Sequence, residues 1–179
     1  MKPRRVIYFG RFQPFHLGHL NALYWLLNRF DEVIVLIGMA DESHTWKNPF
    51  TGQERAQMIY ETIREEGLDP SRIHIASIHT MSVYAGHSQY ITYMLLGAEA
   101  VATANKNAAL AFKHAGIKVI EPPLVMRDKY RGEYIRRLMA EGDEEWRHHV
   151  PRAVARIIDN IGGVERMKII FKSMEEHRR

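Results

Sequence analysis

Short apolar runs rich in β-branched residues alternate with longer segments of helical periodicity through the first two thirds of the chain. Such runs are typical of strands buried on both faces of a parallel sheet. Five of them are candidate strands: residues 6–9, 32–37, 73–78, 100–103 and 118–121. Four segments between them are candidate helices: residues 19–30, 51–67, 88–96 and 106–115. This alternation predicts a doubly wound α/β sheet of about five parallel strands with right-handed crossovers.

The last third of the chain has a different pattern, in which only helices are expected. Three amphipathic segments carry it: residues 132–141, 151–161 and 164–176. At 179 residues the chain has the length of one domain. We therefore expect a single domain over residues 1–179, with a Rossmann-like α/β core in residues 1–123 and a helical C-terminal part in residues 124–179.

The composition is that of an ordinary globular protein. Hydrophobic residues make up 46% and charged residues 26% of the chain, which favours neither disorder nor a membrane class. Because the apolar runs are far shorter than a bilayer span and no leader pattern opens the chain, we expect a cytoplasmic protein. The absence of cysteine excludes disulfides and a thiolate nucleophile. The net charge of +4 comes from basic residues spread among acidic ones, so nucleic acid is not the expected partner.

Residues 10–19 join the first predicted strand to the first predicted helix. A helix N-terminus presents unpaired N–H groups and a partial positive charge, so an anion there meets donors from backbone and side chains together. His16 and His19 lie three residues apart and share one face of the first turn. These features predict a site for a nucleoside triphosphate. A metal site is the alternative, but no cysteine or other ligand is near in sequence. Phe12 and Phe15 are expected to be packing aromatics.

Two further polar loops follow predicted strands, at residues 43–51 and 127–137. Parallel strands end at the same edge of a sheet, so both loops are expected on the rim that carries the imidazoles. The first loop also fits an ordinary connection, with Thr51 and Glu54 as the capping box of the next helix. In the second, Arg136 and Arg137 point about 100° apart on a helix, so they cannot both face one ligand. Arg137 is expected on the solvated face.

Three segments, residues 10–19, 43–55 and 130–137, closely resemble archaeal nicotinamide-nucleotide adenylyltransferases, and the similarity extends over nearly the whole chain. The His-x-Gly-His motif at residues 16–19 alone marks the wider nucleotidyltransferase superfamily, whereas Asn-Pro-Phe-Thr-x-x-Glu-Arg at residues 48–55 is more specific. The resemblance implies transfer of AMP from ATP to nicotinamide mononucleotide, which gives NAD and pyrophosphate. It also implies a homo-oligomer, and Mg²⁺ that is bound with ATP without dedicated protein ligands.

The resemblance assigns three groups of residues. Those expected at the phosphates and the reacting centre are Arg11, His16, His19, Lys47 and Arg136. Those expected to bind the rest of ATP or NAD are Gly10, Phe12, Gln13, Gly18, Asn105, Tyr130, Arg131 and Gly132. On the acceptor side the chain departs from the family pattern, since His87 stands where relatives have an aromatic that stacks on nicotinamide and His79-Thr80 where they have Pro-Asp. The residues expected at the acceptor are Thr80, Tyr84 and His87. The acceptor's own phosphate would attack, so no protein base is needed, and phosphate beside the imidazoles is expected to raise their pKa.

The chain departs from the family pattern in one of these segments. Relatives often have Tyr-Ser-Gly-Thr-Glu where this chain has Tyr-Arg-Gly-Glu-Tyr at residues 130–134, so two hydroxyl contacts are missing. Arg131 is expected to replace them with a stronger phosphate contact, while Glu133 either caps the helix or repels the ligand. Two alternatives remain for the function: adenylyl or cytidylyl transfer to another phosphate such as flavin mononucleotide or phosphopantetheine, and a nucleic-acid-binding protein on the same fold.

Overall fold

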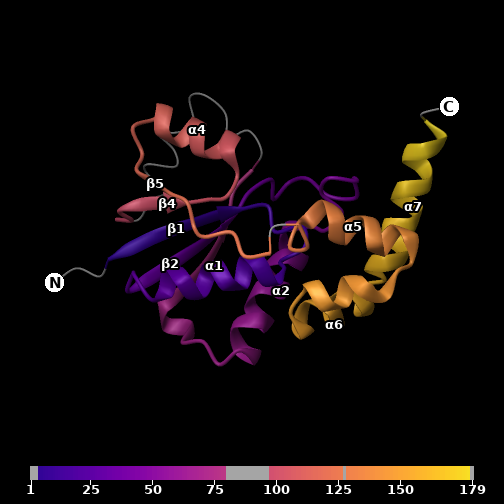
Figure 1. Ribbon diagram of the computed structural model, residues 1–179, viewed down its shortest axis with the longest axis horizontal. Helices are drawn as coiled ribbons and strands as arrows, with labels where there is room; N and C mark the ends of the chain where they lie inside the picture. Colours follow the sequence, from indigo (N-terminus) through magenta and orange to yellow (C-terminus); the bar gives the residue numbers. More distant parts are fainter. Residues whose placement is uncertain (1–3, 80–96, 127, 178–179) are drawn as a thin grey trace.

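One sheet of five parallel strands forms the centre of the molecule (Figure 1). The computed structural model describes residues 4–79, 97–126 and 128–177. The strands lie in the order β3-β2-β1-β4-β5, and every pair is parallel. Their bounds are β1 Arg5–Gly10, β2 Glu32–Ile37, β3 Ile73–Ser77, β4 Ala100–Ala102 and β5 Val119–Ile120. The predicted doubly wound sheet is confirmed. Its strand order reverses between β1 and β4, which is where a ligand crevice is expected at the carboxyl ends.

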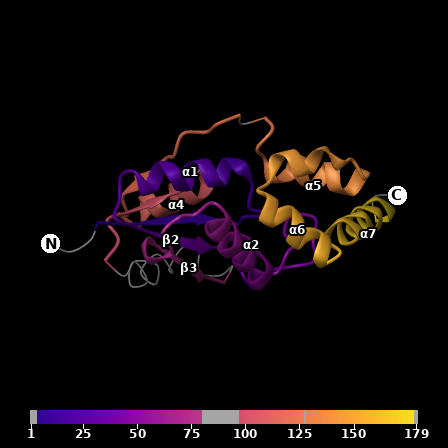
Figure 2. The same ribbon diagram turned by 90° about the horizontal axis from the view of Figure 1, so that it is seen from below.

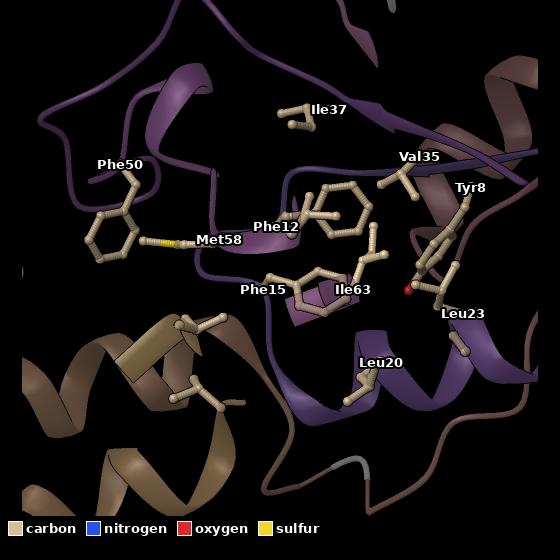
Figure 3. Packing of buried hydrophobic residues seen from close by; sticks show 14 of the residues in the cluster. Tyr8, Phe12, Phe15, Leu20, Leu23, Val35, Ile37, Phe50, Met58 and Ile63 are labelled. Atoms are coloured by element: carbon tan, nitrogen blue, oxygen red, sulfur yellow. The ribbon is translucent and has the colours of Figure 1, made fainter. Parts of the chain in front are cut away.

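Helices cover both faces of the sheet because alternate residues of each strand point to opposite sides. Val6 and Tyr8 of β1 pack with α1 (Leu17–Leu27) and α2 (Gly52–Glu65), as Figure 3 shows for the region around Tyr8. Ile7 and Phe9 pack on the other side with α4 (Lys106–His114). Phe12 and Phe15 are fully buried in the first cluster, so their predicted packing role is confirmed. The predicted helix at 88–96 lies outside the described residues.

The C-terminal helices group beyond one end of the sheet (Figure 2). They are α5 Gly132–Glu141, α6 Arg152–Asn160 and α7 Gly163–Glu176, with a 3-10 segment at Glu144–His149 that the sequence pattern did not predict. α6 contacts α2, and α5 contacts α7. In Figure 1 this group lies at the carboxyl ends of the strands, so α5 begins at the rim where β1 ends.

An ion pair between α2 and α7 joins the helical part to the α/β core. Arg166 donates to both carboxylate oxygens of Glu54 at 2.7 and 2.8 Å and to the carbonyl of Pro49 at 3.1 Å. Glu54 also accepts from the backbone N–H of Thr51, which completes the predicted capping box. Burial raises the pKa of Glu54, but its hydrogen bonds with Arg166 and Thr51 outweigh burial and leave the pKa below its ordinary value of 4.5.

We expect Arg166→Met to lower the free energy of unfolding by about 1–3 kcal/mol at pH 7, the scale of hydrogen bonds to a charged group. Because the folded pKa of Glu54 is lowered, its contribution is present above pH 4.5 and is lost as the pH falls through the folded pKa. Urea titrations at pH 7 and pH 3.5 measure both values. The difference between wild type and variant should shrink in acid, and the exposed Lys172→Met on the same helix serves as control. An equal difference at both pH values contradicts this account of the ion pair.

Candidate active site

Two adjoining cavities lie at the carboxyl end of β1, at the strand-order reversal. The first has a volume of about 290 Å³ and lies between the β1–α1 loop, the start of α4 and the start of α5. The second, of about 200 Å³, lies between α1 and residues 122–131. Tyr8, His16, His19 and Ala104 line both cavities. The two imidazoles therefore stand where the cavities meet.

His16 and His19 hold each other in place at the start of α1. His16 is the N-cap, and its Nδ1 accepts the backbone N–H of His19 at 3.3 Å. In return, Nδ1 of His19 accepts the backbone N–H of His16 at 3.2 Å. The rings stack with centroids 3.5 Å apart, and the ring of His19 also packs on Phe12 at 4.9 Å. The predicted shared face is confirmed, and the pair forms a capping box made of two histidines.

This geometry fixes the charge and the tautomer of both rings. A neutral imidazole whose Nδ1 accepts a hydrogen bond carries its proton on Nε2, so each ring presents Nε2–H as the donor for a ligand. Burial lowers the pKa of His16 to about 3, and the charge of Arg136 adds to that effect. Burial and His16 also hold the pKa of His19 well below its ordinary value. Without a bound ligand both imidazole rings are therefore neutral near pH 7. The expected rise in their pKa when phosphate binds beside them stays a prediction.

Arg136 places a buried positive charge against the first cavity. Its side chain is 4% exposed, and it donates through one terminal nitrogen to the carbonyl of Gln13 at 2.8 Å. Its Nε is buried without a hydrogen-bond partner in the described structure. Burial lowers the pKa of Arg136 to about 10, and the charge of Arg11 contributes. Glu133, which lines the same cavity, offsets part of this effect. A guanidinium that is buried without a hydrogen-bonded carboxylate is costly unless an anion binds it. Arg137 is exposed, as predicted.

Close backbone contacts shape the walls around these donors. A Cβ at Gly18 would lie 2.9 Å from Cβ of Tyr130, and a Cβ at Gly132 would lie 2.9 Å from the carbonyl oxygen of Gln13. Only glycine therefore allows the 128–132 segment and the start of α5 to approach the β1–α1 loop. Asn105 also lines the first cavity, where its side chain caps α4 by accepting from Asn107 and Ala108 N–H groups.

Several predicted site residues come together at the cavities, and others do not. Those that line the first cavity are Gly10, Arg11, Phe12, Gln13, His16, His19, Asn105, Gly132 and Arg136. Gly18, Tyr130 and Arg131 line the second. The side chain of Gln13 pairs with the backbone N–H and carbonyl of Phe50, so it fixes two loops together. Lys47 is exposed and lines neither cavity. Thr80, Tyr84 and His87 lie outside the described residues.

Two residues that position the site were missed by the sequence reasoning. Arg55 is fully buried and donates to the carbonyls of Arg11, Gly38 and Met39, each at 2.8 Å, and to that of Thr51 at 3.1 Å. It thereby joins the ends of β1 and β2. Asn48 accepts from Arg11 at 3.3 Å and donates to Glu42 at 2.6 Å, which orients the Arg11 guanidinium. Their place in the Asn-Pro-Phe-Thr-x-x-Glu-Arg segment was the available signal.

The described ranges contain no group of three or more His, Asp or Glu placed to hold a metal ion. Within the same ranges, no helix has both the length and the apolar character that crossing a bilayer requires. Any divalent cation at the cavities would therefore need oxygens from a bound ligand in addition to those of the described residues.

Comparison with known proteins shows which family the chain belongs to. Residues 7–139 match the family model described as cytidylyltransferase-like. An uncharacterized protein of Archaeoglobus fulgidus is 53% identical over 93% of this chain and 95% of its own length. Nicotinamide-nucleotide adenylyltransferase of Ignicoccus hospitalis is 40% identical over 94% of this chain and 98% of its own.

Among solved structures, a bifunctional NMN adenylyltransferase/ADP ribose pyrophosphatase of Francisella tularensis, complexed with AMP and manganese ion, superposes with a TM-score of 0.67 at 18% identity. The match covers 95% of this chain and 56% of that protein, so the chain spans little more than half of its length. At 18% identity this structural similarity supports only the assignment of the fold. The fold is the five-stranded parallel sheet described above.

Proposed function

Because the chain belongs to the cytidylyltransferase-like family, and within it to the nicotinamide-nucleotide adenylyltransferases, we propose that it transfers AMP from ATP to nicotinamide mononucleotide. The products are NAD and pyrophosphate. The observation that carries the proposal is the His16–His19 pair, whose two Nε2–H donors stand where two cavities meet, beside the buried guanidinium of Arg136. These donors suit a polyphosphate in the first cavity, and the second cavity leaves room for the nucleoside.

The reaction needs alignment and charge stabilisation rather than a protein nucleophile. A phosphate oxygen of the acceptor attacks the α-phosphorus of ATP and forms a new P–O bond. The bond from the α-phosphorus to the bridging oxygen breaks, and pyrophosphate leaves with that electron pair. His16 and His19 donate to the α-phosphate and the bridging oxygen, where negative charge grows in the transition state. Because the attacking phosphate is already ionised, no side chain has to remove a proton.

The remaining residues divide between the phosphates and the nucleoside. Arg11 and Arg136 hold the outer phosphates against the first cavity. Lys47 lines neither cavity, so its proposed phosphate contact requires its side chain to reach in from the neighbouring loop. The second cavity takes adenine and ribose, beside Gly18, Tyr130 and Arg131. Asn105 and the backbone of Phe12 complete the nucleotide contacts. Thr80, Tyr84 and His87 are proposed for the acceptor. When bound with ATP, Mg²⁺ would supply charge neutralisation beside Arg11 and Arg136; the Francisella tularensis protein of similar fold is complexed with AMP and manganese ion.

Three further features belong to the same proposal. The chain functions as one domain, in which the helical part supplies Arg136 and the start of α5 to the site of the α/β core. It acts in the cytoplasm, where ATP and mononucleotides are available. It assembles as a homo-oligomer, which sedimentation or light scattering of the purified protein measures.

Acceptor preference is the direct test of the proposed reaction. We expect purified protein with ATP and Mg²⁺ to convert nicotinamide mononucleotide to NAD with release of pyrophosphate, as followed by chromatography. Nicotinic acid mononucleotide, flavin mononucleotide and phosphopantetheine are the matched acceptors in parallel reactions. Absence of NAD together with a product from another acceptor contradicts the acceptor assignment and leaves nucleotidyl transfer in place. Absence of any product with all four acceptors contradicts the proposed reaction itself.

A further inference from the structure

One carboxylate stands among the donors of the first cavity. Glu133 lies in the first turn of α5 and lines this cavity with Arg11, Arg136 and the two imidazoles. Among the described residues that line either cavity, it is the only acidic one. Its side chain is exposed, and its charge acts on Arg136, where it raises the pKa of the guanidinium against the effect of burial. An acidic group therefore faces the space that the proposed function gives to a triphosphate.

Two charges of the same sign in one cavity repel each other, so a bare triphosphate would bind more weakly because of Glu133. The position of Arg136 brings the triphosphate closer to Glu133 and so increases this repulsion. Arg136 lies one helical turn after Glu133 and on the same face of α5, and its buried Nε has no partner in the described structure. An anion that satisfies Arg136 must consequently approach the start of α5, where the Glu133 carboxylate stands.

We propose that Glu133 holds the divalent cation that accompanies the triphosphate, either directly or through the water shell of the ion. The inference rests on the proposed function and deepens it. Mg²⁺ in proteins is commonly bound by one or two carboxylates together with substrate phosphates, and it keeps several of its waters. A cation between Glu133 and the phosphates turns a repulsive pair into an attractive bridge. This differs from the expectation that the protein supplies no dedicated ligand to Mg²⁺.

The competing explanation is that Glu133 only complements the positive end of α5. A carboxylate in the first turn stabilises a helix whether or not a ligand binds, and Arg131 at the N-cap makes no side-chain capping bond. The two explanations differ in what they predict for metal dependence. A helix-stabilising role leaves the affinity for Mg·ATP unchanged or raises it when Glu133 is replaced, because only repulsion of the phosphates is removed. A cation bridge instead predicts that the affinity for Mg·ATP falls.

The test measures ATP binding by calorimetry without acceptor, once in Mg²⁺ and once in EDTA. The variants are Glu133→Gln, Glu133→Asp and, as a matched control, Glu141→Gln, an exposed carboxylate at the other end of α5. We expect wild type to prefer Mg·ATP, and Glu133→Gln to lose about tenfold or more of that preference, the scale seen for partners of a metal's outer shell. Part of the loss comes from tighter binding of metal-free ATP. Glu133→Asp should keep part of the preference, and Glu141→Gln all of it.

Electron paramagnetic resonance of Mn·ATP gives a second readout that does not depend on turnover. Addition of wild-type protein should change the Mn²⁺ spectrum more than addition of Glu133→Gln at equal saturation with ATP. An unchanged metal preference in Glu133→Gln, a preference lost only through tighter binding in EDTA, or an equal loss of affinity in Mg²⁺ and in EDTA overturns the inference and leaves the proposed function in place. Wild-type protein that binds ATP in neither buffer contradicts the proposed function and this inference together.

Discussion

Replacement of His19 by alanine is expected to lower kcat by about 10² or more, the scale for loss of one transition-state donor. The Nε2–H of His19 stands at the junction of the two cavities, where the proposed reaction develops charge. The ring is half-buried, and loss of solvent together with His16 holds its pKa well below the ordinary value. It therefore acts as a neutral donor whose orientation is fixed by the capping box, so nothing has to reorganise during the reaction.

The variant also removes one half of the capping box, because Nδ1 of His19 accepts the backbone N–H of His16. Loss of a cap costs about 1 kcal/mol of stability, which is too little to account for the expected loss of rate. Thermal unfolding of the variant separates the two effects. His148→Ala, an exposed histidine outside the cavities, is the control and should keep wild-type kcat. Wild-type kcat in His19→Ala would remove this ring from the chemistry.

Arg136→Met is expected to reduce kcat/KM for ATP by about 10² or more while it changes stability little. The loss follows because one charged donor to the outer phosphates disappears, and such donors act where charge develops in the transition state. Stability changes little because two effects oppose each other, each on the order of 1–3 kcal/mol. The variant loses the bond to the Gln13 carbonyl and the attraction of Glu133, but it also removes a buried charge whose pKa burial lowers to about 10.

Arg137→Met is the matched control, since it removes the adjacent guanidinium from the exposed face of the same helix. Steady-state rates at several ATP concentrations, with urea unfolding of both variants, provide the comparison. We expect a large effect on kcat/KM only at residue 136. Equal rates for the two variants would show that Arg136 does not contact the phosphates. A collapse of stability in Arg136→Met alone would mean that the guanidinium is a structural group.

Local patterns were enough to predict the sheet and the place of the site. The buried strands are continuous apolar runs, and each lies beside a helix of clear periodicity, so element type followed from spacing alone. The rotation of 100° per residue along a helix separated Arg136 from Arg137 correctly. Residues 10–19 lie between a strand and a helix, which predicted that they stand at the carboxyl-terminal edge of the sheet. The two cavities lie at this edge.

Contacts between distant segments could not be predicted in the same way. A helix of ordinary polarity does not reveal that Arg55 is fully buried or that it binds the carbonyls of two strand ends. Likewise, the pairing of Gln13 with the backbone of Phe50 joins residues 37 positions apart. The mutual capping of His16 and His19 depends on ring orientations, which spacing does not fix. For Lys47 the family pattern assigns a phosphate role, whereas the structure places the side chain outside both cavities.

A crystal structure with a non-hydrolysable ATP analogue and Mg²⁺ is the most direct measurement of the central claim. The account predicts the α-phosphate within hydrogen-bonding distance of Nε2 of both His16 and His19, with Arg136 on the outer phosphates and adenine in the second cavity. Polyphosphate bound elsewhere on the protein, with both imidazoles away from every phosphorus atom, would contradict it.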